Sequence, residues 1–192
     1  FSPLSIPSCS LWLDANDAST VVVPYETKVS QWQDKSGNGN HYGQTTSSAL
    51  PAYSASAING KLGVATDGGL GYPQFLTHSV TTEFVDGNNH FTTFIVAQQW
   101  KANGGNGYGV YFSFGNDVTG AGGYGTQYSH FYAGDANDQI VGNYAAPHNR
   151  DARHTVPGGI SNWHGVNHIL TNRSYAVGTE VRVTGSTVAQ ET

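Results

Sequence analysis

Short segments of apolar or alternating residues recur along the chain, separated by turns rich in Gly, Asn and Asp. Each segment has the length of a β-strand, and none shows the period of about 3.6 residues that marks an amphipathic helix. The pattern predicts an all-β fold with single helical turns such as one at Ala15–Thr20, where Asp14 is the expected N-cap. The predicted strands are Ser10–Leu13, Val21–Val23, Val29–Trp32, Leu62–Thr66, Phe91–Gln99, Tyr108–Phe114, Gln127–Tyr132, Gln139–Tyr144, Val166–Thr171 and Glu180–Thr184.

Two of these segments carry further expectations about the sheets. Phe91–Gln99 is the best candidate for a central strand, because Phe94–Ala97 is apolar without interruption, as in strands covered on both faces. Glu180–Ser186 resembles a strand and turn after which further strands are needed to cover an open sheet edge. We therefore expect that the natural polypeptide is longer, or that another chain covers this edge.

Composition narrows the class of protein. A chain of 192 residues suits a single β domain over residues 1–192, and 25 glycines with only 11% charged residues favour many turns and an uncharged polar surface. The net charge of −5 provides no basic field for nucleic acid or anionic membranes. Cys9 is the single cysteine, so no intrachain disulfide is expected. No apolar run approaches the ~18 to 20 residues of a membrane span, so membrane insertion is not expected.

Two tryptophan motifs near the start carry a family resemblance. Leu11–Thr20 reads LWLDANDAST and Val29–Gln44 reads VSQWQDKSGNGNHYGQ, each joining an apolar strand pattern to a dense polar turn. The pair resembles the opening of the laminin-G-like branch of the concanavalin A-like jelly rolls. This resemblance implies an antiparallel β-sandwich, in which Trp12, Asp14, Trp32 and Asp34 belong to the scaffold.

The same resemblance supplies the expected setting, since this branch is common in secreted sugar-binding modules and in structural proteins of large DNA viruses and phages. It implies a virion-surface module that acts as a minor capsid, decoration or fibre component and recognises glycans. Other virion structural proteins and host cell-surface glycans are then the expected partners. The alternatives are a secreted or cell-surface carbohydrate-binding adhesin and a polysaccharide-degrading glycoside hydrolase.

Paired carboxylates of a hydrolase are missing from the sequence. Laminarinase-type enzymes of the resembling fold place a Glu-x-Asp-x-x-Glu motif on one strand, and retaining hydrolysis needs two carboxyl groups ~5 Å apart. The glutamates Glu26, Glu83, Glu180 and Glu191 form no such motif, and no Gly-x-Ser-x-Gly elbow is present. We therefore expect a protein that is not an enzyme.

Candidate sugar-binding residues lie in the second half of the chain, where aromatic faces and polar groups suited to sugar stacking occur in turns. Trp100 ends a predicted strand, and Trp163 follows the Pro157–Gly159 turn. His148 and His154 bracket the most charged stretch, expected to be a loop whose arginines bind a carboxylated or sulfated sugar or are simply solvated. Ordinary packing is the alternative for each aromatic residue. The candidate set is Trp100, Tyr108, His148, Arg150, Arg153, Trp163 and His164.

Calcium is the one cofactor that the sequence suggests, because it binds hard oxygen ligands. One candidate cluster is Asp135, Asn137 and Asp138, and a second consists of Asp34, Asn38 and Asn40. The alternative is that these side chains cap turns by accepting hydrogen bonds from nearby amides. His164 and His168 have zinc-like spacing, but in an extended segment they would lie ~13 Å apart and share no ion.

Overall fold

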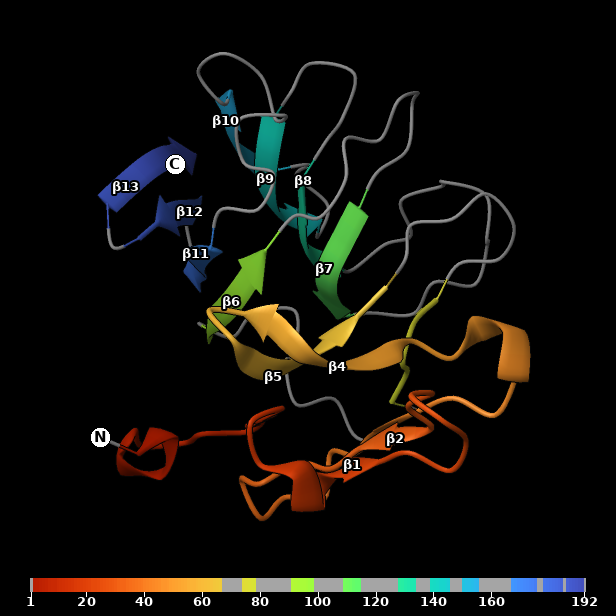
Figure 1. Ribbon diagram of the computed structural model, residues 1–192. Coiled ribbons are helices and arrows are strands. Elements are labelled where there is room, and N and C mark those ends of the chain that lie inside the picture. Colours follow the sequence, from red (N-terminus) through yellow and green to blue (C-terminus); the bar gives the residue numbers. More distant parts are fainter. Residues whose placement is uncertain are drawn as a thin grey trace. The chain divides into compact units, whose positions relative to one another are not determined.

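A computed structural model describes most of the first third of the chain and the strands of the remainder. The described residues are 2–66, 74–78, 91–98, 109–114, 128–133, 139–145, 150–155, 167–175, 178–184 and 186–191. They form antiparallel strands and three short 3-10 turns, so the fold is all-β (Figure 1). The chain divides into two compact units, Phe1–Phe84 and Val85–Thr192. The described residues include no long apolar helix of the kind that crosses a membrane.

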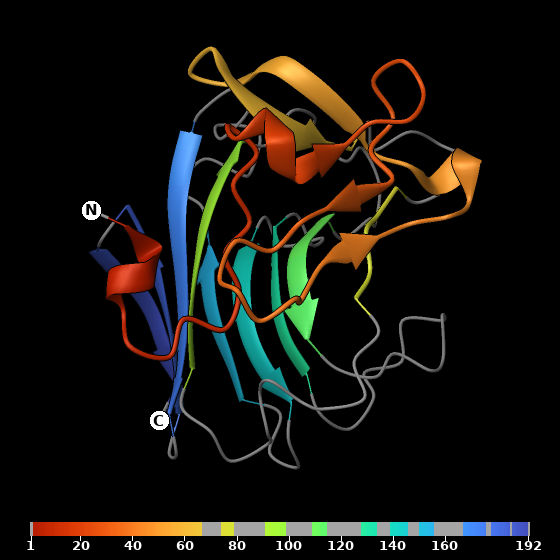
Figure 2. The ribbon, with the colours of Figure 1, turned by 90° about the horizontal axis from the view of Figure 1, so that it is seen from below.

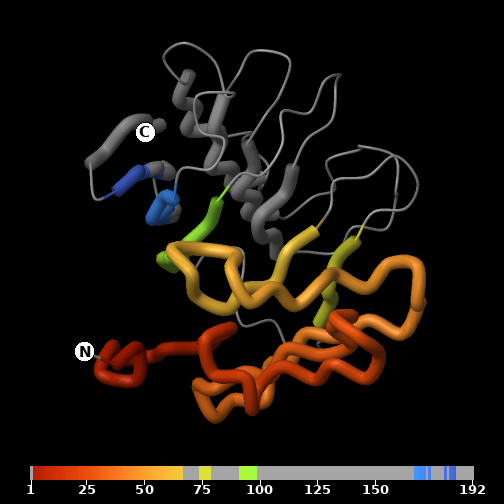
Figure 3. The backbone as a smooth tube through the Cα atoms, in the orientation of Figure 1, coloured from red at the N-terminus to blue at the C-terminus, as the bar shows by residue number. Residues whose placement is uncertain are grey.

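The first unit contains a small three-stranded sheet, which can be followed in red and orange in Figure 3. Its strands are β1 (Val21–Val22), β2 (Gln31–Trp32) and β3 (Tyr42–Gly43), in the order β1-β2-β3. An isolated bridge ties Gly43 of this sheet to Thr77, and another joins Lys28, which precedes β2, to Ala52. The fully buried side chains Val29 and Pro51 lie at this junction, and Val29 N donates to Pro51 O at 2.9 Å.

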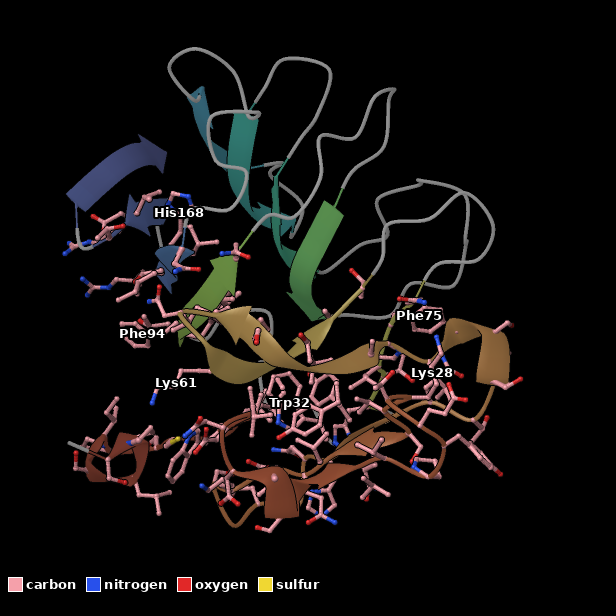
Figure 4. The ribbon with its side chains drawn as sticks, in the orientation of Figure 1. Lys28, Trp32, Lys61, Phe75, Phe94 and His168 are labelled. Carbon is pink, nitrogen blue, oxygen red and sulfur yellow. The ribbon has the colours of Figure 1, made fainter. Side chains whose placement is uncertain are left out.

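A hairpin follows in the same unit. β4 (Ala52–Ile58) pairs with β5 (Lys61–Ala65), and Ile58 lies opposite Lys61 across a two-residue turn. The turn residues Asn59 and Gly60 have φ of 50° and 69°. Positive φ at both positions characterises the type I′ turn, whose twist matches that of paired strands. Trp32 lies among the side chains between β2 and this hairpin, labelled in Figure 4.

The second unit contains two four-stranded antiparallel sheets. One sheet has the order β10-β9-β8-β7 and the other the order β13-β12-β11-β6 (Figure 2). Strand β10 lies close to β12 and β13, so the two sheets approach each other at that end. The strands are β6 (Phe91–Gln98), β7 (Gly109–Phe114), β8 (Tyr128–Ala133), β9 (Gln139–Ala145), β10 (Arg150–Thr155), β11 (Asn167–Tyr175), β12 (Gly178–Val183) and β13 (Ser186–Glu191).

Most predicted strands are confirmed, with boundaries shifted by a few residues. The exceptions are informative. Ser10–Leu13 forms no strand, β3, β4 and β13 were not predicted, and residues 150–155 form β10 instead of a loop. β13 pairs with β12, so the edge of β12 that was expected to be open is covered within the chain. The helical turn is a 3-10 turn at Ala18–Thr20 capped by Asp17, not by Asp14.

The prediction of a central, doubly covered strand at Phe91–Gln99 is wrong. β6 pairs only with β11 among the described strands and ends its sheet. Phe94 and Val96 are exposed, whereas the neighbouring Ala97 is buried. The uninterrupted apolar run therefore marks one buried and one exposed face, because successive residues of a strand point to opposite faces.

Candidate functional site

The best-defined polar cluster is built around the turn of residues 34–41, called here the Asp34 turn. The Asp34 carboxylate is buried and accepts from the backbone N–H of Trp12 at 2.9 Å, of Ser36 at 2.8 Å and of Asn40 at 3.1 Å. The Ser36 hydroxyl donates a fourth hydrogen bond, at 2.7 Å. The carboxylate thus accepts hydrogen bonds from its own turn and from a segment more than twenty residues earlier in the chain.

Two asparagines of the Asp34 turn hold the earlier segment, residues 9–12, called here the clamped segment. Asn38 Nδ2 donates to Cys9 O at 3.0 Å, and Asn40 Nδ2 donates to Ser10 O at 2.7 Å. The Ser36 hydroxyl, which donates its one proton to Asp34, lies 3.2 Å from Ser10 O. Apart from one backbone bond, from Lys35 N–H to Trp12 O at 2.8 Å, the clamped segment is therefore anchored by side chains rather than by a β-ladder, which explains why the predicted strand at Ser10–Leu13 is absent.

A second charge cluster lies beside the turn. Lys35 Nζ lies 3.0 Å from Asp14 Oδ2, 2.7 Å from Asp17 Oδ2 and 4.5 Å from the centre of the Trp12 ring. Its hydrogen bond to Asp17 raises the pKa of Lys35, and the same contact, together with Ser19, lowers the pKa of Asp17 to about 2. Lys35 thereby joins the two tryptophan motifs by two ion pairs and a cation–π contact.

Burial and charge perturb other ionisable groups of the first unit. Burial acts to raise the pKa of the Asp34 carboxyl, but the hydrogen bonds from Trp12, Ser36 and Asn40 outweigh it and lower that pKa. Burial, and then the charge of Asp34, raises the pKa of the Tyr42 phenol. Asp34 is therefore held as a carboxylate whose acceptor capacity is already used by the chain.

Two histidines contact the Asp34 turn. His41 Nδ1 accepts from the backbone N–H of Asp34 at 2.9 Å. His78 Nε2 lies 3.2 Å from Asn40 Oδ1, and its ring is 5.7 Å from that of Tyr42. Neither histidine was predicted from the sequence, and His78 could not be, because the turn and residues 74–78 meet only in the folded chain.

This geometry favours turn capping over calcium at Asp34, Asn38 and Asn40. Both Asp34 oxygens accept hydrogen bonds, and both asparagine amides donate to backbone carbonyls. In the part of the chain that the structure describes, no three His, Cys, Asp or Glu side chains gather around a possible ion. The assignment of Asp34, with Trp12, to the scaffold agrees with these contacts.

Most of the predicted ligand-binding residues lie outside the described residues. This applies to Trp100, Tyr108, His148, Trp163, His164 and the calcium candidates Asp135, Asn137 and Asp138. Arg150 and Arg153 belong to β10, where they pair in register with Tyr144 and Val141 of β9. The charged stretch is thus in a sheet, because it pairs with β9, the preceding strand, although its own polar composition does not indicate a strand. The proposed sugar and calcium roles stay predictions.

His168, which the zinc-like spacing paired with His164, is placed by the structure on β11. Its side chain is buried, and burial lowers the pKa of its imidazole. Because His164 lies outside the described residues, the expectation that the two histidines share no ion stays a prediction.

An apolar surface on the second unit was not predicted. Val96 of β6 lies directly opposite Ile169 of β11, and Phe94 precedes Val96 by two residues on β6. These three side chains, called here the apolar face, are 61%, 49% and 65% exposed. They share one side of the β6–β11 pair, because residues two apart on a strand and residues opposite each other lie on the same face. Phe94 and His168 are labelled in Figure 4.

Comparisons with known proteins found no family model that matches the chain, and no curated protein or solved structure that matches it. The likeness to the laminin-G-like jelly rolls therefore rests on the two tryptophan motifs.

Proposed function

We propose that this protein is a non-enzymatic surface module of a virion, a minor capsid, decoration or fibre component that is also able to recognise glycans. Its architecture in this proposal is a concanavalin A-like jelly-roll sandwich. Three features support it: the tryptophan motifs, the antiparallel all-β structure and the small charge content of the chain.

The observation that carries the proposal is the apolar face. Phe94, Val96 and Ile169 are adjacent in the sheet and largely exposed, and contiguous exposed apolar side chains mark surfaces that associate with other proteins. On the same face of the sheet, Arg173 lies opposite Glu180, and Glu180 pairs with Arg182. An apolar centre with a charged rim is the usual anatomy of a protein interface. We assign this face to contact with another structural protein of the particle.

The direct test of the setting is to look for the chain in particles. Mass spectrometry of purified virions should detect its peptides, and immunogold labelling of intact particles should place it on their outside. Absence from purified particles, with the protein present in the producing cells, would contradict the proposal.

The role of the apolar face is tested by replacing Phe94 and Val96 with threonine, which keeps the β propensity of β6. We expect binding to the particle's purified structural proteins to fall at least tenfold, since buried aromatic anchors carry much of the energy of an interface. Thr92→Ser, on the same exposed side of β6, is the matched control and should bind as the wild type does. A fall of many degrees in Tm with Phe94→Thr/Val96→Thr would show instead that the face packs within the chain.

The glycan part of the proposal requires its own measurement. A glycan array with the purified protein should give binding that Trp100→Ala and Trp163→Ala each weaken about tenfold, since stacking on an indole ring is a main contribution to sugar binding. Binding of no glycan would leave an assembly protein without a recognition role. Release of reducing ends from a panel of polysaccharides would contradict the non-enzymatic assignment.

A further inference from the structure

One face of the β10-β9-β8-β7 sheet carries a row of polar residues that crosses all four strands, which run side by side in Figure 2. Residues paired directly across neighbouring strands lie on the same face of a sheet. The members of this row, called here the polar row, pair in register from each strand to the next. In order from β7 to β10 they are Ser113, His130, Asn143 and Asp151.

The neighbouring row, one residue away on each strand, has the opposite character. Its members also pair in register from β7 to β10 and are Phe112, Phe131, Gly142 and Ala152. Successive residues of a strand belong to opposite faces, so this second row lies on the other face of the sheet. Antiparallel sheets commonly pack one apolar face into the core and leave the polar face to water. The division therefore favours the polar row as the side that meets a ligand.

Two further residues on the face of the polar row suit sugar binding. Tyr132 follows His130 by two residues on β8, and Arg153 follows Asp151 by two residues on β10. Arg150 is three residues from Arg153, so it lies on the other face. The sheet thus separates the two arginines that the sequence suggested as joint sugar ligands, and only Arg153 stays with the polar row.

The order of residues along the polar row fits binding rather than nucleophilic catalysis. A catalytic serine needs a histidine beside it and a carboxylate within hydrogen-bond reach of that histidine. Ser113 is next to His130, but Asp151 lies two strands beyond His130, a separation of ~10 Å at the spacing of neighbouring strands. Serine, histidine and asparagine each offer donors and acceptors, and aspartate adds an acceptor. Such a set matches the hydroxyl groups of a sugar, which both donate and accept.

We propose that the polar row is a binding site for an uncharged oligosaccharide that lies across strands β7 to β10, with Tyr132 as a stacking ring. The row spans three strand spacings, ~14 Å, which fits a short oligosaccharide better than a single sugar ring. Asp151 and Arg153 bring one charge of each sign to the β10 end of the row, so the site does not require an acidic sugar. This assignment rests on the glycan recognition in the proposed function and adds where the glycan binds.

A glycan array with the purified full chain identifies the ligand, and isothermal titration calorimetry then measures its affinity. We expect Ser113→Ala, His130→Gln and Asn143→Ala each to weaken binding about fivefold or more, the effect of losing one hydrogen bond. Ser129→Ala is the matched control for Ser113→Ala, and His154→Gln is the matched control for His130→Gln. Both control positions lie on the opposite face of the sheet, so these variants should bind as the wild type does.

Thermal unfolding followed by circular dichroism accompanies each titration. Because the three substitutions in the polar row lie on three strands, misfolding of one variant leaves the other two to decide. Wild-type affinity in the folded row variants, with binding weakened by Trp100→Ala or Trp163→Ala, would overturn the polar row and leave glycan recognition standing. Binding of no glycan would overturn both, and a preference for carboxylated or sulfated glycans would overturn the assigned ligand.

Discussion

At the scale of single residues, Asp34 connects two segments of the first unit through its carboxylate. One buried carboxylate accepts from three backbone amides and one hydroxyl, and it joins two segments that are distant in sequence. Charge-assisted hydrogen bonds of this kind are about twice as strong as neutral ones. The stability of the first unit should therefore respond strongly to this position.

Asp34→Ala should lower the free energy of unfolding by about 2–4 kcal/mol, because it leaves the amides of Trp12, Ser36 and Asn40 without their acceptor. Asp34→Asn keeps Oδ1, which serves the Trp12 and Ser36 amides, and should cost less. Urea unfolding followed by tryptophan fluorescence measures both. Equal losses for the two variants would show that the Oδ1 bonds contribute little.

The pH dependence of stability should carry the signature of the Lys35 cluster. The pKa of Asp17 falls from 3.8 to about 2 on folding, so its contribution is present above pH 3.8 and is lost as the pH falls toward 2. The pKa of Lys35 is raised above 10.5, so its contribution is present below pH 10.5 and is lost at higher pH. The stability difference between wild type and Asp17→Asn, from thermal unfolding across pH, should be constant between these limits and shrink outside them. A difference that grows in acid would contradict this assignment.

At the scale of elements, the β4–β5 hairpin depends on one glycine beyond its turn. The register of the two strands shifts between Ser54 and Ile58, and a Cβ placed on Gly63 would lie 2.4 Å from Ala57 Cβ. Contact at that distance forces the backbone to move. The bulge is thus compatible only with a glycine facing a small side chain.

Gly63→Ala should destabilise the first unit by about 1–3 kcal/mol through this overlap. Ala57→Gly removes the opposing methyl group and costs only about 0.5–1 kcal/mol by itself. In the double variant Gly63→Ala/Ala57→Gly much of the loss should be recovered, which a double-mutant cycle of urea unfolding measures. Purely additive effects would mean that the two positions do not meet.

At the scale of the whole molecule, the division into two compact units implies that a destabilising substitution in one unit increases local unfolding of that unit and not of the other. Each unit has its own buried side chains, Val29 and Leu50 in the first and Leu170 in the second. Cooperative opening follows such packed groups rather than the chain as a whole.

We therefore expect Gly63→Ala to increase hydrogen exchange in peptides covering β4 and β5 while those covering β11 and β12 exchange as in the wild type. Exchange measured by mass spectrometry on the full chain at neutral pH resolves these peptides. An equal increase in both regions would show that the units unfold as one.

Much of the fold was predictable because strand periodicity and turn chemistry are local. The turn after Asp34 and most strands, such as β7 and β9, follow from a few neighbouring residues. β10 was not predictable, because Arg150–Thr155 has a polar composition and its strand conformation depends on pairing with β9. The contact of His78 with Asn40 depends likewise on segments that meet only on folding.

The sequence by itself determined the all-β class, the approximate positions of most described strands and the turn that follows Asp34. Only the tertiary structure decided which strands end the sheets, that Phe94 and Val96 are exposed, and that the clamped segment is anchored by side chains. The physical reason is one of range: backbone preference and turn chemistry act over a few residues, whereas burial and hydrogen-bond partners are set by segments far apart in the chain. The polar turn at Asp34 illustrates both, since its residues were recognisable in sequence and their partners were not.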